Sequence, residues 1–138
     1  MESKIGISLA VVSLLTAPAL TSAALPDGGR AAKGKITYGR YCVACHGPEG
    51  KGDGSLAGDL RVPVPDLTLL ASRNGGTFPA ERVSRIIAGG EVAHGHGTND
   101  MPAWGDAFKK TKGTDEATVQ AAIRNLAEYL HSLQRSGQ

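Results

Sequence analysis

The sequence is poor in several residue types, and each shortage narrows what the chain can be. Its 138 residues include two Cys, two Met, two Phe, three Tyr and one Trp. So few aromatic side chains can fill only a modest core, and a bulky apolar cofactor would supply the missing volume. The formal charge of only +2 gives no indication of nucleic-acid binding. The length is that of a single domain.

Both cysteines of the chain stand in one short motif, Cys42-Val-Ala-Cys45-His46. This is the C-x-x-C-H pattern of covalent haem attachment. Two thiols at this spacing can each add to one vinyl group of a haem, and the adjacent histidine is then placed to ligate the iron. A zinc site or a redox dithiol is the alternative, but no second C-x-x-C or suitably spaced histidine pair is present. The motif predicts one covalent haem c.

The N-terminal residues have the organisation of an export signal. An apolar run over residues 5–17 is followed by small residues up to Ala24. The run is shorter than the roughly 20 residues of a membrane-spanning helix. We therefore expect residues 1–23 to be a cleaved signal peptide, with a retained membrane anchor as the alternative. Bacterial haem attachment takes place outside the cytoplasm, so we expect a periplasmic protein with one domain over residues 24–138 and no stable membrane insertion.

Hydrophobic spacing and capping residues predict an all-helical chain, and no segment reads as a strand. Asp66 and Thr114 are expected to cap two of the helices, because their side chains can accept from free backbone N–H groups. Pro79 is expected in the first turn of another. The predicted helices cover residues 30–41, 67–72, 79–88 and 114–134.

The segments between these helices are expected to be irregular. Pro63 and Pro65 bias the stretch before Leu67 towards an extended conformation. One of their carbonyls is expected to accept a hydrogen bond from His46, because a ligating histidine usually donates through its second ring nitrogen. Pro65 is preferred, and Pro63 remains open. Residues 109–113 are expected to form a basic connector. Its lysines are interpreted as a solvated face, with a docking patch for a redox partner as the alternative.

The scarcity of methionine also identifies a candidate for the second iron ligand. Met1 belongs to the export segment, which leaves Met101, and the proline after it stiffens the backbone. Iron held by His and Met is an electron-transfer arrangement with a raised potential, and it leaves no vacancy for oxygen or substrate. His94 and His96, in the predicted loop of residues 91–100, are the alternative ligands.

Together these features resemble the class I c-type cytochromes, the monohaem bacterial type. The similarity covers about residues 30–134. It rests on the C-x-x-C-H motif, on an M-P-x-aromatic-G pattern, and on a helix pair in which a glycine and an aromatic residue cross a later helix. The residues that carry the last two features are Met101, Pro102, Trp104 and Gly105, then Gly34 and Tyr38 with Leu126 and Tyr129.

The resemblance implies an all-α cytochrome c fold, with several helices around one haem and the N- and C-terminal helices crossing. It implies haem binding by Cys42, Cys45, His46 and Met101, with His46 and Met101 on the iron. The expected function is that of a one-electron carrier between a redox protein donor and an acceptor, not that of an enzyme. An electron-transfer subunit of a dehydrogenase or oxidase complex is the alternative, and we expect a monomer or such a subunit.

Overall fold

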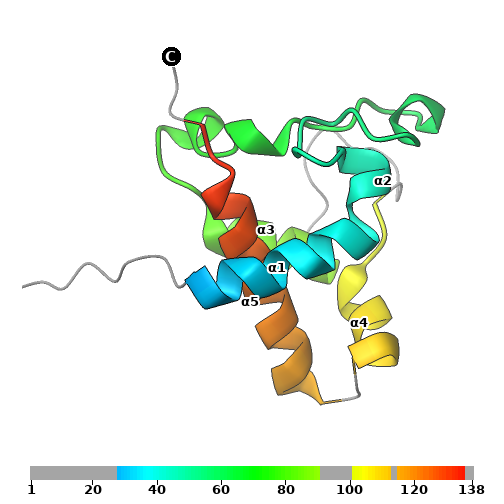
Figure 1. Cartoon of the computed structure of the whole chain (residues 1–138), viewed down its shortest axis with the longest axis vertical. Helices are drawn as coiled ribbons and strands as arrows, with labels where there is room; N and C mark the ends of the chain where they lie inside the picture. The colour runs from blue at the N-terminus through cyan, green and yellow to red at the C-terminus, as the bar shows by residue number, and fades with distance from the viewer. Residues whose placement is uncertain (1–27, 91–100, 113–114, 136–138) are drawn as a thin grey trace, which may run out of the picture.

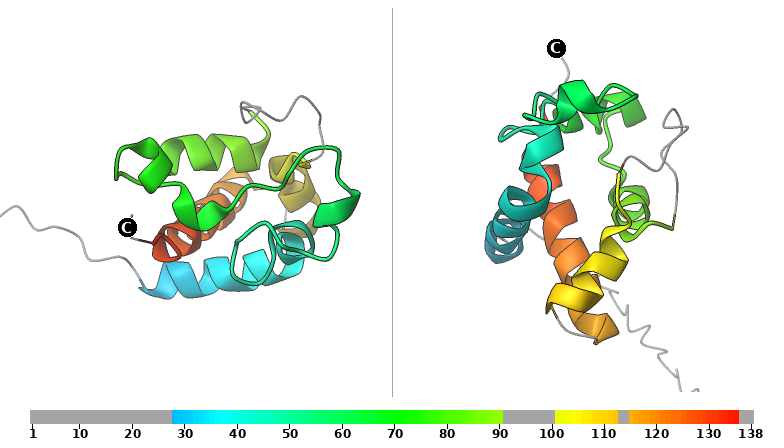
Figure 2. Two further views of the ribbon diagram at one scale, coloured as in Figure 1. Left: turned by 90° about the horizontal axis from the view of Figure 1, so that it is seen from above. Right: turned by 90° about the vertical axis from the view of Figure 1, so that its right-hand side faces the viewer.

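The computed structural model describes residues 28–90, 101–112 and 115–135, and within these ranges it is helical without a strand (Figures 1 and 2). The all-α prediction is confirmed. None of the described helices is long and apolar enough to cross a membrane. The α-helices are α1 (Gly28–Tyr41), α2 (Val43–His46), α3 (Ala80–Ala88), α4 (Trp104–Lys112) and α5 (Glu116–Ser132), and the 3₁₀-helices are η1 (Ala57–Asp59), η2 (Leu67–Leu69) and η3 (Ser72–Asn74).

Helices α1 and α5 cross at a glycine (Figure 1). A Cβ at Gly34 would overlap the backbone carbonyl of Asn125 and would lie 2.8 Å from Cβ of Tyr129. One turn later, the ring of Tyr38 lies 5.2 Å from that of Tyr129, centroid to centroid. The two backbones can approach this closely only because position 34 has no side chain. The predicted crossing of the terminal helices is therefore confirmed.

The hydrophobic core lies where α1, α3, α4 and α5 meet. Helix α5 contributes most of it, because its apolar residues recur every three or four positions and so share one face. Each large side chain removed from water stabilises the fold by about 1.5–3 kcal/mol. The largest fully buried side chains are Tyr38, Phe108, Val119, Ile123 and Leu126.

Helix α4 is the main departure from the sequence prediction. Residues 109–113 were expected to form a connector, but α4 continues to Lys112, so that prediction is wrong. Trp104, Ala107 and Phe108 recur at three- and four-residue spacing, which defines a helical face behind the lysines. Phe108 is completely buried, whereas Lys109 is exposed and lies 3.5 Å from Glu116. The buried face, and not the lysine-rich surface, decides the local structure.

Two other helix boundaries differ from those expected. Asp115, and not Thr114, caps α5, with its carboxylate accepting hydrogen bonds from the backbone N–H groups of Ala117 and Thr118. Thr114 itself lies outside the described residues. Helix α3 begins at Ala80, so Pro79 is its N-cap and not its first-turn residue.

Asp66 caps η2 as predicted, because its carboxylate accepts a hydrogen bond of 2.8 Å from the backbone N–H of Thr68. The helix expected over residues 67–72 is, however, two short 3₁₀-helices, η2 and η3. In such short helices most backbone N–H and C=O groups have no partner within the helix, so they can bond to other parts of the molecule. That availability is used by the C-terminal residues described below.

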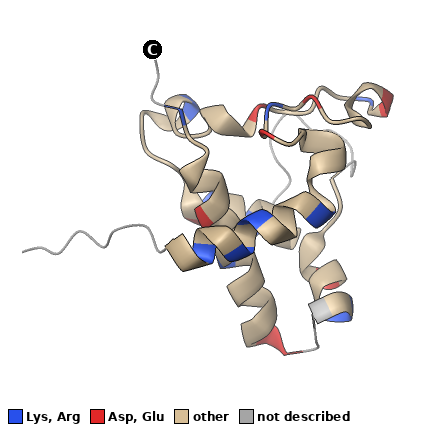
Figure 3. Cartoon of the chain, in the orientation of Figure 1, with Lys and Arg blue, Asp and Glu red and all other residues tan. Residues whose placement is uncertain are grey.

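Charged side chains are unevenly distributed over the fold (Figure 3). Arg30, Lys33, Lys35 and Arg40 follow one another along α1, and no acidic residue occurs in this helix. Acidic residues occur instead in the segment from Glu49 to Asp66. The small net charge therefore conceals an uneven distribution, in which α1 carries only basic charged residues.

Candidate functional site

A cavity of about 590 Å³ lies among the helices, and Cys42, Cys45, His46 and Met101 all line it. Its size is typical of pockets that bind cofactors, which are roughly 300–1,000 Å³. The remaining lining is mostly apolar and comes from α1, α3, α4 and α5 and from the segment of residues 60–70. It includes Tyr38, Tyr41, Val83, Ile86, Ile87, Trp104, Leu126 and Leu130. The fold thus brings the four sequence-predicted residues to the same cavity, although Met101 is distant from the others in sequence.

The junction of α1 and α2 places the two thiols and the imidazole. The backbone N–H of Cys42 donates to the carbonyl of Tyr38 (2.9 Å), and that of His46 donates to the carbonyl of Cys42 (2.8 Å). Helical hydrogen bonding therefore continues from α1 into the motif. Positions i, i+3 and i+4 of a helix share one face, so Cys42, Cys45 and His46 can all point to one bound group.

Burial affects the chemistry of the first thiol. Removal from water, and to a lesser extent the neighbouring Cys45, raises the pKa of Cys42 to about 12. Reactive dithiols and metal-bound cysteines need a lowered pKa, because the thiolate is the reacting form. Within the described residues there is also no cluster of three or more His, Cys, Asp or Glu that could hold a metal ion. The described residues thus offer no further ligands beside the two thiols and His46 for a metal ion.

His46 has its Nδ1 atom buried. Pro63 and Pro65, the two candidates for accepting a hydrogen bond from it, line the same cavity. The choice between their carbonyls stays a prediction. The apolar lining, the two thiols and the imidazole together fit a covalently attached haem, since each part of that group finds a matching residue.

The chain near Met101 is held by packing. The ring of Trp104 lies 5.3 Å from that of Tyr41 and 6.1 Å from that of Phe108. A Cβ at Gly105 would lie only 2.8 Å from the carbonyl oxygen of Ala88, so the start of α4 presses against the end of α3. Met101 is 40% exposed at the cavity edge. The residues 101–105, packed on the end of α3, are called the methionine wall below.

His94 and His96, the alternative ligands, lie outside the described residues. The comparison between them and Met101 as iron ligand therefore stays a prediction. Sequence reasoning missed the support that Tyr41 and Phe108 give to the methionine wall. Tyr41 contacts Trp104 from 63 positions away, and Phe108 contacts it from within α4, a helix that was not predicted. The one local signal is the position of Tyr41, directly before the first cysteine.

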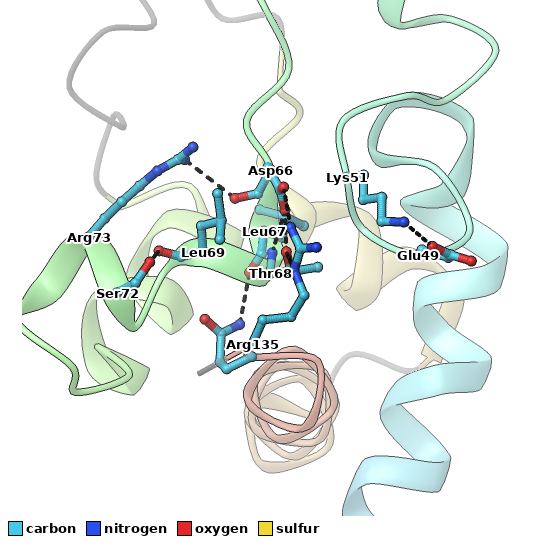
Figure 4. A network of polar contacts seen from close by, with 10 residues as sticks. Glu49, Lys51, Asp66, Leu67, Thr68, Leu69, Ser72, Arg73 and Arg135 are labelled. Atoms are coloured by element: carbon cyan, nitrogen blue, oxygen red, sulfur yellow. Dashed lines mark hydrogen bonds and ion pairs between the residues drawn. The ribbon is translucent and has the colours of Figure 1, made fainter. Parts of the chain in front are cut away.

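The residues that follow α5 are hydrogen-bonded to the segment that contains η2 and η3 (Figure 4). The side-chain amide of Gln134 donates to the carbonyls of Leu67 (2.8 Å) and Leu130 (2.7 Å) and accepts from the N–H of Ala71 (2.8 Å). The backbone N–H of Arg135 donates to the carbonyl of Thr68 (3.0 Å). We call Gln134 and Arg135 the C-terminal clamp.

The clamp also involves the capping carboxylate of η2. The guanidinium of Arg135 donates to Oγ1 of Thr68 (3.1 Å) and lies 3.4 Å from Asp66 (Figure 4). Burial alone would raise the pKa of Asp66, but hydrogen bonds from Thr68 and the nearby positive charge of Arg135 lower it overall. Leu67 and Leu70, within the clamped stretch, line the cavity. The motif of residues 42–46 and the clamped residues 47–71 form the histidine wall.

Comparison with known proteins agrees with this geometry. The family model for cytochrome c matches residues 31–134. The chain is 36% identical over 107 residues to the cbb3-type cytochrome c oxidase subunit CcoP of Azospirillum brasilense. It is 35% identical over 107 residues to the subunit of the same name from Azospirillum sp. (strain B510). Each match covers 78% of this chain but 30% of the relative. No solved structure matches.

Proposed function

The chain belongs to the cytochrome c family, and from that premise we propose that it is a periplasmic one-electron carrier with a single haem c ligated by His46 and Met101. The observation that carries the proposal is that Cys42, Cys45, His46 and Met101 line the same cavity. When bound, the haem supplies the Fe(II)/Fe(III) couple through which one electron at a time is accepted and released.

The residues of the chain have distinct tasks in this function. Cys42 and Cys45 would hold the porphyrin by thioether bonds, and His46 and Met101 would be the residues that ligate the iron. A filled iron has no vacancy for a substrate, so the protein passes electrons without itself being a catalyst. The apolar lining keeps water away from the iron, which disfavours the more highly charged oxidised state and raises the potential.

The expected export of the chain belongs to the same proposal. Residues 1–23 act as a signal peptide, and the mature protein acquires haem in the periplasm. A donor and an acceptor protein then meet it there. Its interaction with them is brief, as suits a carrier.

The mass and the visible spectrum of the protein isolated from the periplasm test the main points together. We expect a mature chain that begins after Ala23 or Ala24 and carries the added mass of one haem. The oxidised protein should show the weak far-red band of a sulfur–iron bond. A chain without added haem, or one retained in the membrane with residues 1–23 intact, would contradict the proposal.

The iron ligand is tested by Met101→Ala, with a double variant of His94 and His96 to Ala as the matched control. We expect Met101→Ala to lose the far-red band and to lower the potential, because a softer ligand that favours the reduced iron is removed. The histidine double variant should keep both properties. The opposite pattern would identify a histidine as the ligand. Rapid binding of carbon monoxide by the reduced wild-type protein would instead indicate an open iron.

A second candidate function is that of an electron-transfer subunit in a redox complex. The relatives named as subunits of cbb3-type cytochrome c oxidase favour it. This chain spans about 30% of their length, so it would correspond to part of such a subunit. Purification from the native source under mild conditions separates the two functions. A free monomer supports the carrier, and co-elution with a catalytic oxidase or dehydrogenase chain supports the subunit.

A further inference from the structure

Tyr38 makes contacts at both ends of the C-x-x-C-H motif. Its backbone carbonyl accepts from the N–H of Cys42 (2.9 Å), the first residue of the motif. Its hydroxyl donates to the carbonyl of Gly47 (2.7 Å), the residue that follows His46. Residue 38 therefore brackets the motif, with one hydrogen bond before it and one after it.

The second of these hydrogen bonds lies inside the protein. Tyr38 is only 2% exposed and lines the cavity. Burial, followed by the neighbouring Cys42, raises the pKa of the Tyr38 hydroxyl above its ordinary value, so the group remains a neutral donor at physiological pH. The carbonyl of Gly47 has a second, longer partner in the N–H of Gly50 (3.2 Å). Loss of the hydroxyl would leave a buried carbonyl with only that weaker bond.

Helix α2 is too short to fix its own orientation. Its last residue, His46, and its C-cap residue, Gly47, are held to the preceding turn by backbone hydrogen bonds to the carbonyls of Cys42 (2.8 Å) and Val43 (2.9 Å). Those bonds fix the helix internally but not its rotation relative to α1. The carbonyls of α2 accept hydrogen bonds from the segment that follows it, at Gly52, Gly54 and Leu56 (2.8–3.1 Å). The hydroxyl of Tyr38 adds a side-chain tie between the C-cap residue of α2 and the long helix α1, which is itself packed closely against α5 at Gly34.

We propose that Tyr38 is a positioning residue for His46, and that its hydroxyl fixes the rotation of α2 and thereby the direction of the imidazole into the cavity. The role of His46 as iron ligand rests on the proposed function, whereas the bracket around the motif does not. The family resemblance assigns the ring of Tyr38 to helix packing. The new element is the task of the hydroxyl.

Tyr38→Phe removes the hydroxyl and keeps the ring, and Tyr129→Phe is its matched control. Tyr129 is also in the core, its ring is 5.2 Å from that of Tyr38, and its hydroxyl takes no part in the bracket. A role limited to ring packing predicts the same result for both variants, because both keep their rings. A positioning role predicts an effect at α2 for Tyr38→Phe alone.

Two measurements on the holoprotein report on α2. Amide hydrogen exchange at His46 and Gly47 should be about fivefold faster in Tyr38→Phe, as expected when one neutral hydrogen bond is lost. The paramagnetically shifted haem methyl resonances of the oxidised protein report the orientation of the axial imidazole, and they should move in this variant. Tyr129→Phe should leave both close to wild type. Haem attachment lost in Tyr38→Phe but kept in Tyr129→Phe would also support the bracket.

Equal behaviour of the two variants, or unchanged exchange and methyl shifts in Tyr38→Phe, would overturn the proposal. Failure of the proposed function is recognised separately, in the wild-type protein, by the absence of covalent haem or of the sulfur–iron band. The comparison of exchange at His46 and Gly47 between the two variants does not depend on the sulfur–iron band, so a wrong iron ligand and a wrong positioning role give different results. A faster exchange without a change in methyl shifts would show that the hydroxyl stabilises α2 without orienting the ligand, and it too would overturn the positioning role.

Discussion

The two walls of the cavity are held in different ways. The histidine wall is fastened mainly by hydrogen bonds, from Tyr38 to Gly47, from Leu67 to Gly50 (2.7 Å), and from Gln134 to Leu67. The methionine wall is held mainly by packing, through contacts between the aromatic rings of Tyr41, Trp104 and Phe108 and through the close approach of α4 to α3. Hydrogen bonds are directional and fix orientation, whereas apolar packing fixes distance and excludes water. The histidine wall, which carries Cys42, Cys45 and His46, is thus the wall whose orientation is fixed by hydrogen bonds.

The largest effect is expected where the support of the histidine wall meets α5. Gly34→Ala should destabilise the holoprotein by about 3 kcal/mol or more, because the new methyl group overlaps backbone that cannot move freely. Gly39→Ala, on the same helix with nothing within 4 Å among the described atoms, should instead be stabilising by about 0.5–1 kcal/mol. Denaturant unfolding measures both. Similar values for the two variants would mean that α1 and α5 do not depend on this contact.

The second-largest effect is expected for a substitution that disrupts the packing of the methionine wall alone. Gly105→Ala should cost about 2–3 kcal/mol, because its Cβ would lie 2.8 Å from the carbonyl of Ala88 and push α4 away. The far-red sulfur–iron band should weaken, while the N–H of Leu67 keeps its protection from exchange. Gly58→Ala, which meets nothing within 4 Å among the described atoms, is the control. Equal loss of protection at Leu67 would show that the walls are not separate units.

A smaller loss of stability is expected when the C-terminal clamp no longer holds the histidine wall. Gln134→Ala removes three hydrogen bonds of the C-terminal clamp and should cost about 1–2 kcal/mol, less than their sum because water replaces part of them. Exchange at the N–H of Ala71 should accelerate, and the sulfur–iron band should persist. The control is Gln120→Ala, since the amide of Gln120 bonds only to exposed Glu116 on the same helix. Loss of the sulfur–iron band with unchanged exchange at the N–H of Ala71 would show that the clamp supports the methionine wall and not the histidine wall.

The smallest effect is a dependence on pH. The pKa of Asp66 is held below its ordinary 3.8 in the folded protein. Its contribution to stability is therefore fully present above that ordinary value and is lost as the pH falls through the lowered one. As the pH falls from above 3.8 through the lowered pKa, the wild-type protein should lose a contribution to its stability that Asp66→Asn lacks at every pH. Urea unfolding of both proteins across this range measures the difference, and parallel curves would show that Asp66 contributes nothing.

The comparison also explains what could be predicted from sequence. The attachment motif, the glycine of the helix crossing and the apolar face of α5 are local patterns with a known spacing, and the structure agrees with them. Helix α4 was missed because its surface is rich in lysine and Phe108 is its one large side chain that is fully buried among the described residues. The clamp could not be predicted, because Gln134 and its partner Ala71 are 63 positions apart and neither residue type signals the contact.

The two proposed iron ligands come from different kinds of sequence signal, a motif for His46 and a scarce residue type for Met101. The cavity brings Met101 to the same space as His46, as an iron held by both would require. The sequence led to Met101 by elimination, since the other methionine belongs to the expected signal peptide. Elimination works for a rare residue, and it would not have worked for leucine or lysine.

The crossing of α1 and α5 has a consequence for the order of events during the proposed export. Its two halves lie near opposite ends of the chain, so closing it requires a long loop and is slow. A chain that emerges N-terminus first presents Cys42 and Cys45 well before α5 arrives to complete their surroundings. We therefore expect an interval in which both thiols are accessible to incoming haem. Haem addition to a chain arrested before residue 116 is the measurement that checks this order.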